Sequence, residues 1–338
     1  MRLRLRIKGK KLWMLCSLVL LAVIFNFCHI QITGVTIPDS AQVGDVVPIT
    51  LNIDISCNSG GTDNLVLGVL MPKGWKGAQN LTGTYNSSKG SGNMVLTPVA
   101  TPAPHGNGAN WPTYMKSTFG IAGNLIDDME WVVMQTDVPI TYANGDKITG
   151  SINLKLKVGA DGNPTLVKLA YVVANTTNGF TSDGFTDGGY GATAEYYNEF
   201  IGNCFSVTGG TGDLVDFCNP QLTTVTPPKS LDNDFVTLTF NSNVTTTGLS
   251  GSSEVYLCAT GVTSDGKTVT VCDQSAKTVL KQTSTGIYQI TFWPRSFFGI
   301  SSTQTLTKMT YFLTDKTGNV QVGYGNTAAP FTYTFKCS

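Results

Sequence analysis

Hydrophobic and polar residues alternate with a period of two along much of this chain. Residues 47–55 (VPITLNIDI) and 152–158 (INLKLKV) follow this alternation, which predicts strands with one buried face. Residues 65–70 (LVLGVL) and 131–134 (WVVM) are continuously apolar, as expected of strands that are buried on both faces. Beyond the first 27 residues no helical period of useful length occurs. The pattern therefore predicts an all-β fold.

Turn signals and a glycine-rich stretch divide the strand pattern into two parts. Asn-Gly-Asp at 144–146 and Asp-Gly-Asn-Pro at 161–164 predict tight turns between strands. The flexible sequence Gly-Gly-Thr-Gly at 209–212 interrupts the pattern before strand signals restart. Many short strands with regular turns predict two tandem immunoglobulin-like β-sandwich domains. The predicted boundaries are a signal at 1–27, a first domain at 28–208, a linker at 209–217 and a second, smaller domain at 218–338.

The first 27 residues form a leader that departs from the β pattern. Six basic residues and no acid occupy positions 2–11, and residues 12–27 are almost wholly apolar. A positive segment followed by a short apolar segment is typical of an export signal peptide. The apolar segment is shorter than the ~20 residues that a membrane-spanning helix needs, so an uncleaved anchor is the lesser alternative. The rest of the chain is therefore expected to function outside the cytosol.

Cys28 directly follows the apolar segment of the leader. Bacterial lipoproteins are cleaved and acylated at a cysteine in this position, so the start of the chain resembles a lipoprotein signal, although Asn26 and Phe27 replace the usual small residues. The resemblance implies a lipid anchor on Cys28 and a place in the cell envelope as an outer-membrane lipoprotein. Residues 29–32 (HIQI) carry no acidic patch, so the membrane face stays open. The alternative is cleavage by signal peptidase nearby, with Cys28 incidental.

Net charge limits the possible partners. The whole chain has 22 basic and 22 acidic residues, and the leader contains six of the basic residues. The chain after the leader therefore carries a net charge of about −6. No basic patch remains to neutralise phosphates, which argues against nucleic acid as a partner. Charged residues make up only 13% of the chain, and their replacement by Gly, Thr, Ser and Asn is common in secreted β-proteins.

After Cys28 the chain contains an even set of cysteines, namely Cys57, Cys204, Cys218, Cys258, Cys272 and Cys337. An even number in an exported chain favours disulfides over metal or catalytic thiols. No Cys-x-x-Cys pair occurs, which argues against zinc and thioredoxin-like sites. The first expected bridge closes a hairpin-like segment, and two others would join the ends of the two domains. These bridges are Cys258–Cys272, Cys57–Cys204 and Cys218–Cys337, with Cys204–Cys218 as the rival arrangement.

The second domain carries a family resemblance. The sequences YQITFWPRSFFGI (288–300) and LTKMTYFLTDKTGNVQ (306–321) combine a strand, a Pro-Arg-x-Phe-Phe turn and a strand that ends in an Asp-x-x-Gly hairpin. Together with EVYL (254–257) and SDG (264–266), they resemble the starch-module-like β-sandwiches of Bacteroidetes surface glycan-binding lipoproteins, which serve polysaccharide utilisation. The chain departs from that pattern at Thr314, where the family usually has an Arg-Asn pair. The resemblance implies carbohydrate binding, a polysaccharide or oligosaccharide partner and association with an outer-membrane transporter complex.

Groups suited to catalysis or metal binding are scarce. His29 and His105 are the only histidines, and His105 lies in a Pro/Gly/Asn-rich loop without a nucleophile-elbow motif. Carboxylates cluster at 127–130 and 195–199, where we interpret them as solvated charges rather than a glycosidase pair. The loop 183–189 lacks the acid spacing of an EF-hand calcium site. We therefore expect that the protein is not an enzyme and uses no catalytic residue, metal or cofactor.

Aromatic residues in polar loops are the candidates for ligand binding. Sugar rings expose apolar C–H faces that can stack on flat aromatic side chains. Trp111 and Tyr114 lie among asparagines and glycines, and Tyr190 and Tyr196 lie in a second loop rich in Gly, Asp and Thr. We predict that these four side chains bind the ligand, with packing inside the protein as the alternative for each. Two other tryptophans are interpreted as structural, namely Trp75 and Trp293.

These observations support two hypotheses of function. The first is a non-catalytic, lipid-anchored cell-surface glycan-binding protein that assists polysaccharide capture. The alternative is a structural or adhesive surface protein made of immunoglobulin-like modules that recognises a protein partner. Immunoglobulin-like sandwiches serve both purposes, so the fold by itself does not decide between them.

Overall fold

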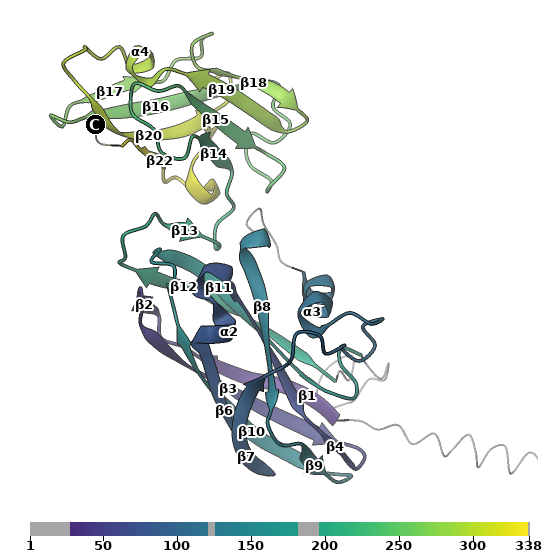
Figure 1. Cartoon of the computed structure of the whole chain (residues 1–338). Helices are drawn as coiled ribbons and strands as arrows, with labels where there is room; N and C mark the ends of the chain where they lie inside the picture. Colours follow the sequence, from purple (N-terminus) through teal and green to yellow (C-terminus); the bar gives the residue numbers. More distant parts are fainter. Residues whose placement is uncertain (1–27, 121–125, 182–195, 337–338) are drawn as a thin grey trace, which may run out of the picture. The chain divides into compact units, whose positions relative to one another are not determined.

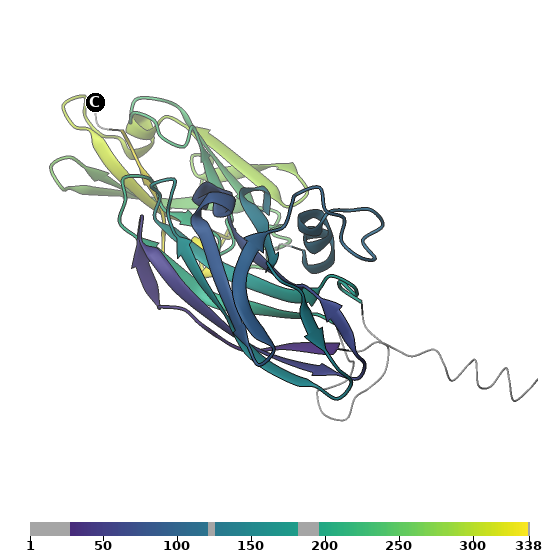
Figure 2. The same ribbon diagram turned by 60° about the horizontal axis from the view of Figure 1, so that its bottom comes forward.

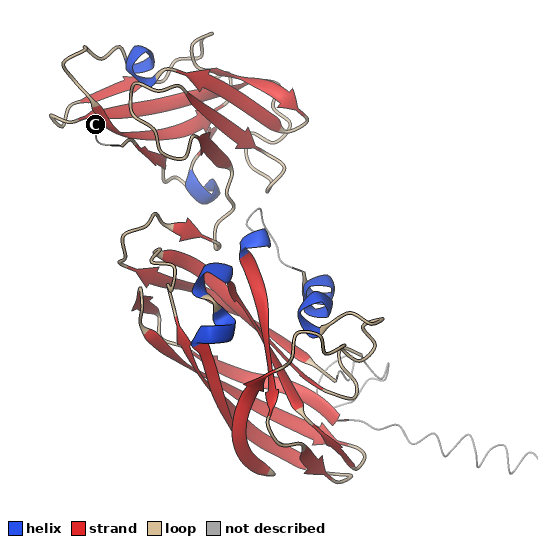
Figure 3. Cartoon of the chain, viewed as in Figure 1, coloured by secondary structure: helices blue, strands red, loops and turns tan. Residues whose placement is uncertain are grey.

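The computed structural model of this 338-residue chain describes residues 28–120, 126–181 and 196–336 (Figure 1). The described residues divide into two compact units: unit 1 comprises residues 28–120 and 128–215, and unit 2 comprises residues 126–127 and 216–336. Strands make up most of the regular structure in both units (Figure 3). None of the helices within the described ranges is long and apolar enough to cross a membrane. The prediction of an all-β fold is confirmed.

Unit 1 is a curled sheet with short helices at its connections. Its strands are β1 (Cys28–Thr36), β2 (Ser40–Gln42), β3 (Val46–Cys57), β4 (Gly61–Asp63), β5 (Leu65–Pro72), β6 (Leu81–Ser87), β7 (Gly90–Leu96), β8 (Met129–Thr136), β9 (Ile140–Tyr142), β10 (Lys147–Lys157), β11 (Thr165–Asn175), β12 (Asn198–Thr208) and β13 (Val215–Asp216). Its helices are η1 (Lys73–Trp75), α2 (Gly77–Asn80) and α3 (Trp111–Phe119). The short helix η2 (Ile126–Asp128) precedes β8 at the boundary between the two units.

The strands of unit 1 form one continuous path that folds back on itself. The order is β1-β3-β10-β6-β7-β8-β5-β11-β12-β2, with β13 paired to β11, and β4 and β9 form a separate two-stranded sheet. Only the β12–β2 pair among these neighbours on the path is parallel. Figures 1 and 2 show the strands as two layers around a common interior, which is the arrangement of a β-sandwich.

The apolar residues of the predicted alternation line the interior of unit 1. On β3 the side chains of Val47, Ile49, Leu51 and Ile53 are buried, and the residues between them face outward or are only partly covered. On β10 the buried residues Ile152, Leu154 and Leu156 lie opposite Leu51, Ile49 and Val47 in an antiparallel register. The strands predicted at 47–55 and 152–158 are therefore confirmed, with their apolar faces packed in the same interior.

The strands β5 and β8 are buried on both faces because α3 covers their outer side. Every residue of β5 is buried, in agreement with its continuously apolar sequence. Met115 of α3 packs so closely on Gly68 of β5 that a methyl group on Gly68 would collide with the Met115 sulfur. Figure 1 shows α3 lying beside β8. The glycine in the LVLGVL strand thus makes room for the helix.

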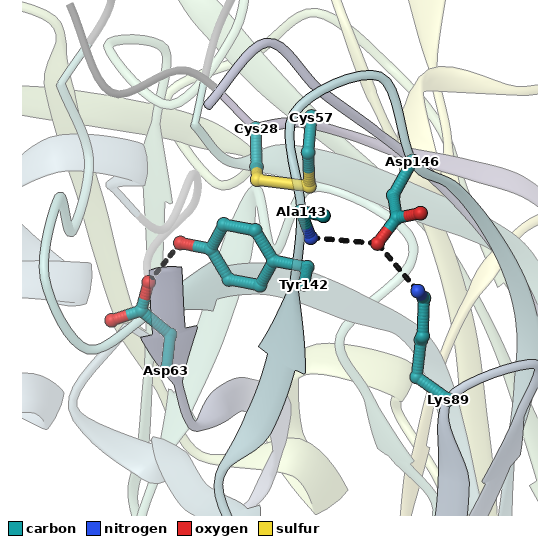
Figure 4. Close-up of a disulfide and its surroundings, with 7 residues drawn as sticks. All are labelled: Cys28, Cys57, Asp63, Lys89, Tyr142, Ala143 and Asp146. Atoms are coloured by element: carbon teal, nitrogen blue, oxygen red, sulfur yellow. Dashed lines mark hydrogen bonds and ion pairs between the residues drawn. A yellow bond between two sulfur atoms is a disulfide. The ribbon is translucent and has the colours of Figure 1, made fainter. Parts of the chain in front are cut away.

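A disulfide joins the first two paired strands of unit 1. Cys28 of β1 lies directly opposite Cys57 of β3, and their sulfur atoms are bonded (Figure 4). The predicted Cys57–Cys204 bridge is therefore wrong, because the sulfur of Cys57 is already used. The predicted lipid anchor on Cys28 is also wrong in this structure, since a lipid thioether would need the same Cys28 sulfur. The antiparallel register of β1 on β3 brings the two cysteines together.

The remaining cysteines follow the sequence prediction in part. Cys258 and Cys272 are bonded, so the predicted local bridge is confirmed. Cys204 and Cys218 each take part in a disulfide. Cys337 lies outside the described residues, so the predicted Cys218–Cys337 pairing stays a prediction.

Unit 2 is a second, smaller sandwich. Its strands are β14 (Thr223–Thr226), β15 (Val236–Asn241), β16 (Val255–Thr263), β17 (Thr268–Val271), β18 (Val279–Ser284), β19 (Ile287–Phe292), β20 (Leu306–Thr314), β21 (Gln321–Val322) and β22 (Phe331–Thr334). Its helices are α4 (Pro294–Phe298) and η3 (Tyr324–Asn326). The strand order is β14-β15-β19-β18-β16-β20-β21, with β17 paired to β16 and β22 to β20.

Unit 2 encloses a core rich in aromatic residues. Phe240 and Tyr288 stack with ring centroids 5.9 Å apart, and Tyr311 stacks on Phe331 at 5.1 Å. Leucines and valines from β15, β16 and β20 fill the space between the two layers. Both units are thus immunoglobulin-like β-sandwiches, as the alternation and turn signals predict.

Candidate functional site

The residues predicted to bind ligand do not form an exposed surface. Trp111 is only 1% exposed, and Tyr196 is buried as well. Tyr114 is half-buried, and Tyr190 lies outside the described residues. The prediction that Trp111 and Tyr196 are ligand-stacking loop residues is therefore wrong, because an aromatic ring that is already covered by protein has no free face for a ligand.

Trp111 is buried because the polar segment around it begins a helix. The Oδ1 atom of Asn110 accepts a hydrogen bond from the Thr113 N–H at 3.0 Å, which caps α3, and Pro112 fits the first helical turn. Within α3, Trp111, Met115 and Phe119 recur every four residues and share one face. That face packs on the outer side of β8 and β5.

Aromatic rings around α3 form a packed cluster, which we call the α3 cluster. Its centre is Phe180, whose ring centroid lies 5.5 Å from Trp111, 4.9 Å from Tyr114, 4.9 Å from Phe119 and 5.6 Å from Tyr197. Three of these contacts are edge-to-face and the one with Tyr114 is tilted, and edge-to-face is a geometry that aromatic pairs prefer. The α3 cluster is therefore a second small core on the outside of the sandwich.

The disulfide end of unit 1 holds polar groups that satisfy one another (Figure 4). The Tyr142 hydroxyl donates to Asp63 at 2.5 Å, and burial together with this bond raises the pKa of Tyr142. Asp146 accepts from the Ala143 N–H at 2.7 Å and pairs with Lys89 at 2.5 Å, and these two contacts lower the pKa of Asp146. A cavity of about 30 Å³ beneath the disulfide has room for little more than a water molecule. These contacts hold together the loops at this end of unit 1.

An exposed aromatic pair lies instead in unit 2. Phe235 is 69% exposed and Trp293 is 41% exposed. Val236 of β15 pairs with Phe292 of β19, so Phe235 and Trp293 occupy the next positions at the ends of these two neighbouring strands. The indole Nε1–H of Trp293 donates to the Asn233 Oδ1 atom at 3.2 Å. These are the large exposed aromatic side chains of the described chain.

Strand alternation places both aromatic residues on the outer face of the sheet. On β15, Val236, Leu238 and Phe240 point into the core, so the residues between them point outward. Tyr288, Ile290 and Phe292 of β19 are likewise buried, which turns Gln289, Thr291 and Trp293 outward.

The outer face continues from the aromatic pair into uncharged polar side chains. The hydroxyl groups of Thr237 and Thr291 are 2.8 Å apart, and Gln289 Nε2 donates to Thr239 Oγ1 at 3.0 Å. None of these four side chains carries a charge. The Phe235–Trp293 surface is defined here as Asn233, Phe235, Thr237, Thr239, Gln289, Thr291 and Trp293.

Trp293 is interpreted from the sequence as structural, yet 41% of it is exposed on the outer face, and the sequence contains a signal that identifies this position. In YQITFW, the alternation of Tyr288, Ile290 and Phe292 assigns Trp293 to the opposite face. The same parity in FVTLTF assigns Phe235 to the outer face. The surrounding Pro-Arg-x-Phe-Phe sequence does supply core residues, because Pro294, Phe297 and Phe298 are buried.

No part of the described chain gathers three or more His, Cys, Asp or Glu side chains in a position to hold a metal ion. The outer face of β15 and β19 offers flat aromatic rings, hydroxyl groups and amides. Such groups are suited to noncovalent recognition of a largely uncharged surface.

Comparison of the sequence with family models gives two matches. A model described as a domain of unknown function (DUF4961) matches residues 30–221, and a second domain of unknown function (DUF8578) matches residues 223–322. No curated protein matches the sequence.

Solved structures show only distant similarity. The collagen-binding domain of a Staphylococcus aureus adhesin is 14% identical, with 55% of this chain and 99% of that chain covered and a TM-score of 0.23. A group B streptococcus pilus 2b backbone protein is 11% identical, with 89% of both chains covered and a TM-score of 0.21. A family 123 glycoside hydrolase from Clostridium perfringens is 12% identical, with 50% of this chain and 22% of that chain covered and a TM-score of 0.23. These scores are too low to support an argument about function.

Proposed function

Because this chain belongs to the DUF4961 family, a domain of unknown function that assigns it no activity, we propose a function from its own surface. We propose that it is a non-enzymatic adhesive surface protein that recognises a partner through the Phe235–Trp293 surface. The observation that carries this proposal is the exposure of two large aromatic side chains at neighbouring strand ends.

Exposed aromatic residues of this kind are suited to binding a partner. Tryptophan, tyrosine and phenylalanine are enriched at interfaces, and tryptophan and tyrosine also supply much of the binding free energy. Neither Phe235 nor Trp293 belongs to the buried core of unit 2, so neither is needed to fill it. Leu231, which is 38% exposed, precedes this surface on the same loop. A partner that covers these side chains would remove apolar area from water.

The leader and the disulfides support a place outside the cytosol. Disulfides persist in oxidising compartments, and this chain has Cys28–Cys57 and Cys258–Cys272. The basic and apolar leader has the pattern of an export signal. Because Cys28 is in a disulfide, attachment through a lipid on this residue is not part of the proposal.

The chemistry of the chain supports a binding role over catalysis. It contains only two histidines, and His105 is exposed on a loop while His29 lies on β1, so the two are on separate elements of unit 1. Adhesion needs no reacting group, because complementary packing against a partner is sufficient.

A protein is the first candidate partner, and a neutral glycan is the second. Aromatic anchors with a polar rim are the usual composition of a protein interface, and Phe235 and Trp293 have such a rim in Asn233 and Thr237. A glycan is favoured by a different observation, namely that the aromatic pair continues into uncharged hydroxyl and amide groups. A glycan partner also agrees with the resemblance of the unit 2 sequence to polysaccharide-utilisation proteins.

The test is binding of the full chain to two arrays, one of immobilised extracellular proteins and one of neutral polysaccharides. The variant carries Phe235→Ala and Trp293→Ala together. We expect it to lose binding to every ligand that the unaltered chain captures, with an unchanged melting temperature.

A matched control carries two exposed apolar substitutions in unit 1, Val46→Ala and Ile201→Ala, which remove side chains that are 58% and 64% exposed. This control should bind normally. Equal binding by the aromatic double variant and the unaltered chain would refute the proposed surface, and capture of polysaccharides alone would select the glycan candidate.

A further inference from the structure

A partly buried ion pair links the two segments that carry the Phe235–Trp293 surface. Asp232 lies on the loop before β15, and Arg295 lies in α4 just after β19. The Arg295 Nη1 atom is 3.6 Å from the Asp232 Oδ1 atom. The two side chains are only 18% and 10% exposed, so this pair differs from the exposed pairs on the surface.

Both members of the pair make further hydrogen bonds. The Arg295 Nη2 atom donates to the carbonyl oxygens of Ser301 at 3.0 Å and Ser302 at 3.1 Å, and also to that of Gln304. The Asp232 Oδ2 atom accepts the Leu306 N–H at 2.9 Å. The planar guanidinium presents its donors to the carboxylate and the carbonyls in one fixed geometry, whereas a lysine ammonium is a compact charge on a flexible stem.

The same two segments are joined a second time at the surface. Asn233 directly follows Asp232 and accepts the indole N–H of Trp293, which lies two residues before Arg295. The ion pair and the indole hydrogen bond therefore both connect the loop before β15 to the segment that follows β19. If the Asp232 loop shifts relative to α4, Asn233 and Phe235 move with it, and the position of Trp293 relative to both changes.

We infer that Asp232 and Arg295 are positioning residues that hold Phe235 and Trp293 in the exposed arrangement that binds the partner. This inference rests on the proposed function for its binding part. An exposed aromatic pair gains affinity when it is held in place beforehand, because less conformational entropy is lost on binding. Neither positioning residue needs to touch the partner, because each acts through the segment on which it lies.

The experiment is fluorine NMR of the full chain labelled with 5-fluorotryptophan, combined with binding to the ligand captured in the arrays. The Trp293 resonance is assigned by its loss in Trp293→Phe. The test variant is Asp232→Asn, whose amide oxygen can still accept from Leu306 but no longer offers a charge to Arg295. The control is Asp234→Asn on the same loop, since Asp234 accepts from the Leu231 N–H at 3.0 Å.

In Asp232→Asn we expect the Trp293 resonance to shift or broaden, the Trp75, Trp111 and Trp131 resonances to stay in place, and binding to weaken about tenfold. Asp234→Asn should change neither the resonance nor the affinity. Arg295→Lys keeps the charge without the planar fork, so its Trp293 resonance and its affinity should fall between those of the unaltered chain and Asp232→Asn. It also serves as the test if Asp232→Asn does not fold.

The two proposals can fail separately. If Trp293→Phe and the aromatic double variant bind normally, the proposed binding surface is wrong, whatever the fluorine spectrum shows. If the aromatic double variant loses binding but Asp232→Asn and Arg295→Lys leave the Trp293 resonance and the affinity unchanged, the positioning role is refuted and the binding surface stands.

Discussion

Two groups of aromatic residues in this protein have opposite environments. In unit 1 the α3 cluster surrounds Phe180, and Trp111 within it is 1% exposed. In unit 2 Phe235 and Trp293 are 69% and 41% exposed. Both groups lie in segments with Gly, Asn, Asp or Pro nearby, so local composition does not distinguish them. The periodicity of the element that carries each residue does.

The period of the helix or strand determines whether each tryptophan lies on the buried side or on the exposed side of that element. Trp111 is the first residue of a helix whose apolar face recurs at Met115 and Phe119, so it shares the covered side. Trp293 follows a strand whose buried residues are Tyr288, Ile290 and Phe292, so it falls on the uncovered side. A tryptophan in a polar segment is thus a candidate for binding when its neighbours in the same period also lie on the outer face.

The largest expected effect is on the stability of unit 1. Trp111→Ala should lower the free energy of unfolding by about 3–5 kcal/mol, because the indole is fully buried and its removal leaves a cavity beside Phe180. Chemical denaturation followed by circular dichroism measures this change. A loss below about 1 kcal/mol would show that Trp111 is not part of a packed core and would break the comparison.

A smaller effect is expected where α3 meets the sheet. Gly68→Ala places a methyl group against the sulfur of Met115, so either the Met115 side chain or the helix must move. The methionine is flexible, and we expect a loss of about 1–3 kcal/mol in the free energy of unfolding. Gly68→Ala should cost less free energy of unfolding when it is introduced into Met115→Ala than when it is introduced into the unaltered chain, because the colliding sulfur is then absent. Additive losses in a double-mutant cycle would contradict a direct contact between the two residues.

Much of the fold could be predicted because it depends on local alternation. Residues 47–55 and 152–158 show the period of two that β3 and β10 retain, and LVLGVL shows the continuous apolarity of β5. The Cys258–Cys272 bridge could be predicted for the same reason, since both cysteines belong to one local hairpin. Cys28–Cys57 could not, because it depends on the register of β1 on β3, and strand pairing is not encoded in either strand alone.

The environments of Trp111 and Trp293 differ in how far the sequence predicts them. Burial of Trp111 depends on a helix of nine residues that starts in a polar segment. The signals in the sequence for the start of this helix are the Asn110 cap and Pro112. Helices this short take most of their stability from packing, which a sequence does not display. The exposure of Trp293, in contrast, follows from strand parity alone and was open to prediction.

Trp293→Ala is the counterpart of Trp111→Ala and should have almost no effect on stability. Trp293 is 41% exposed and has a hydrogen bond to Asn233, so we expect a change within about 0.5 kcal/mol in the free energy of unfolding. The same denaturation experiment on the two tryptophan variants gives the comparison directly. A loss above about 2 kcal/mol would assign Trp293 to the core and remove the basis for a binding surface.

The smallest expected effect concerns the polar row beside the aromatic pair. Thr237→Val with Thr291→Val removes two hydroxyl groups that are 2.8 Å apart and keeps the branched shape that suits a strand, so stability should change by less than about 0.5 kcal/mol. Binding of a protein partner should change by less than about twofold, because residues around an aromatic anchor are energetically near-neutral. A glycan would instead lose hydrogen bonds of about 0.5–1.5 kcal/mol each, so its affinity should fall about tenfold. Calorimetry with the captured ligand separates these outcomes, and Thr283→Val on β18, an exposed threonine outside the surface, is the control. A tenfold loss of affinity that occurs in the Thr237 and Thr291 variant and not in the control would therefore identify the partner as a glycan rather than a protein.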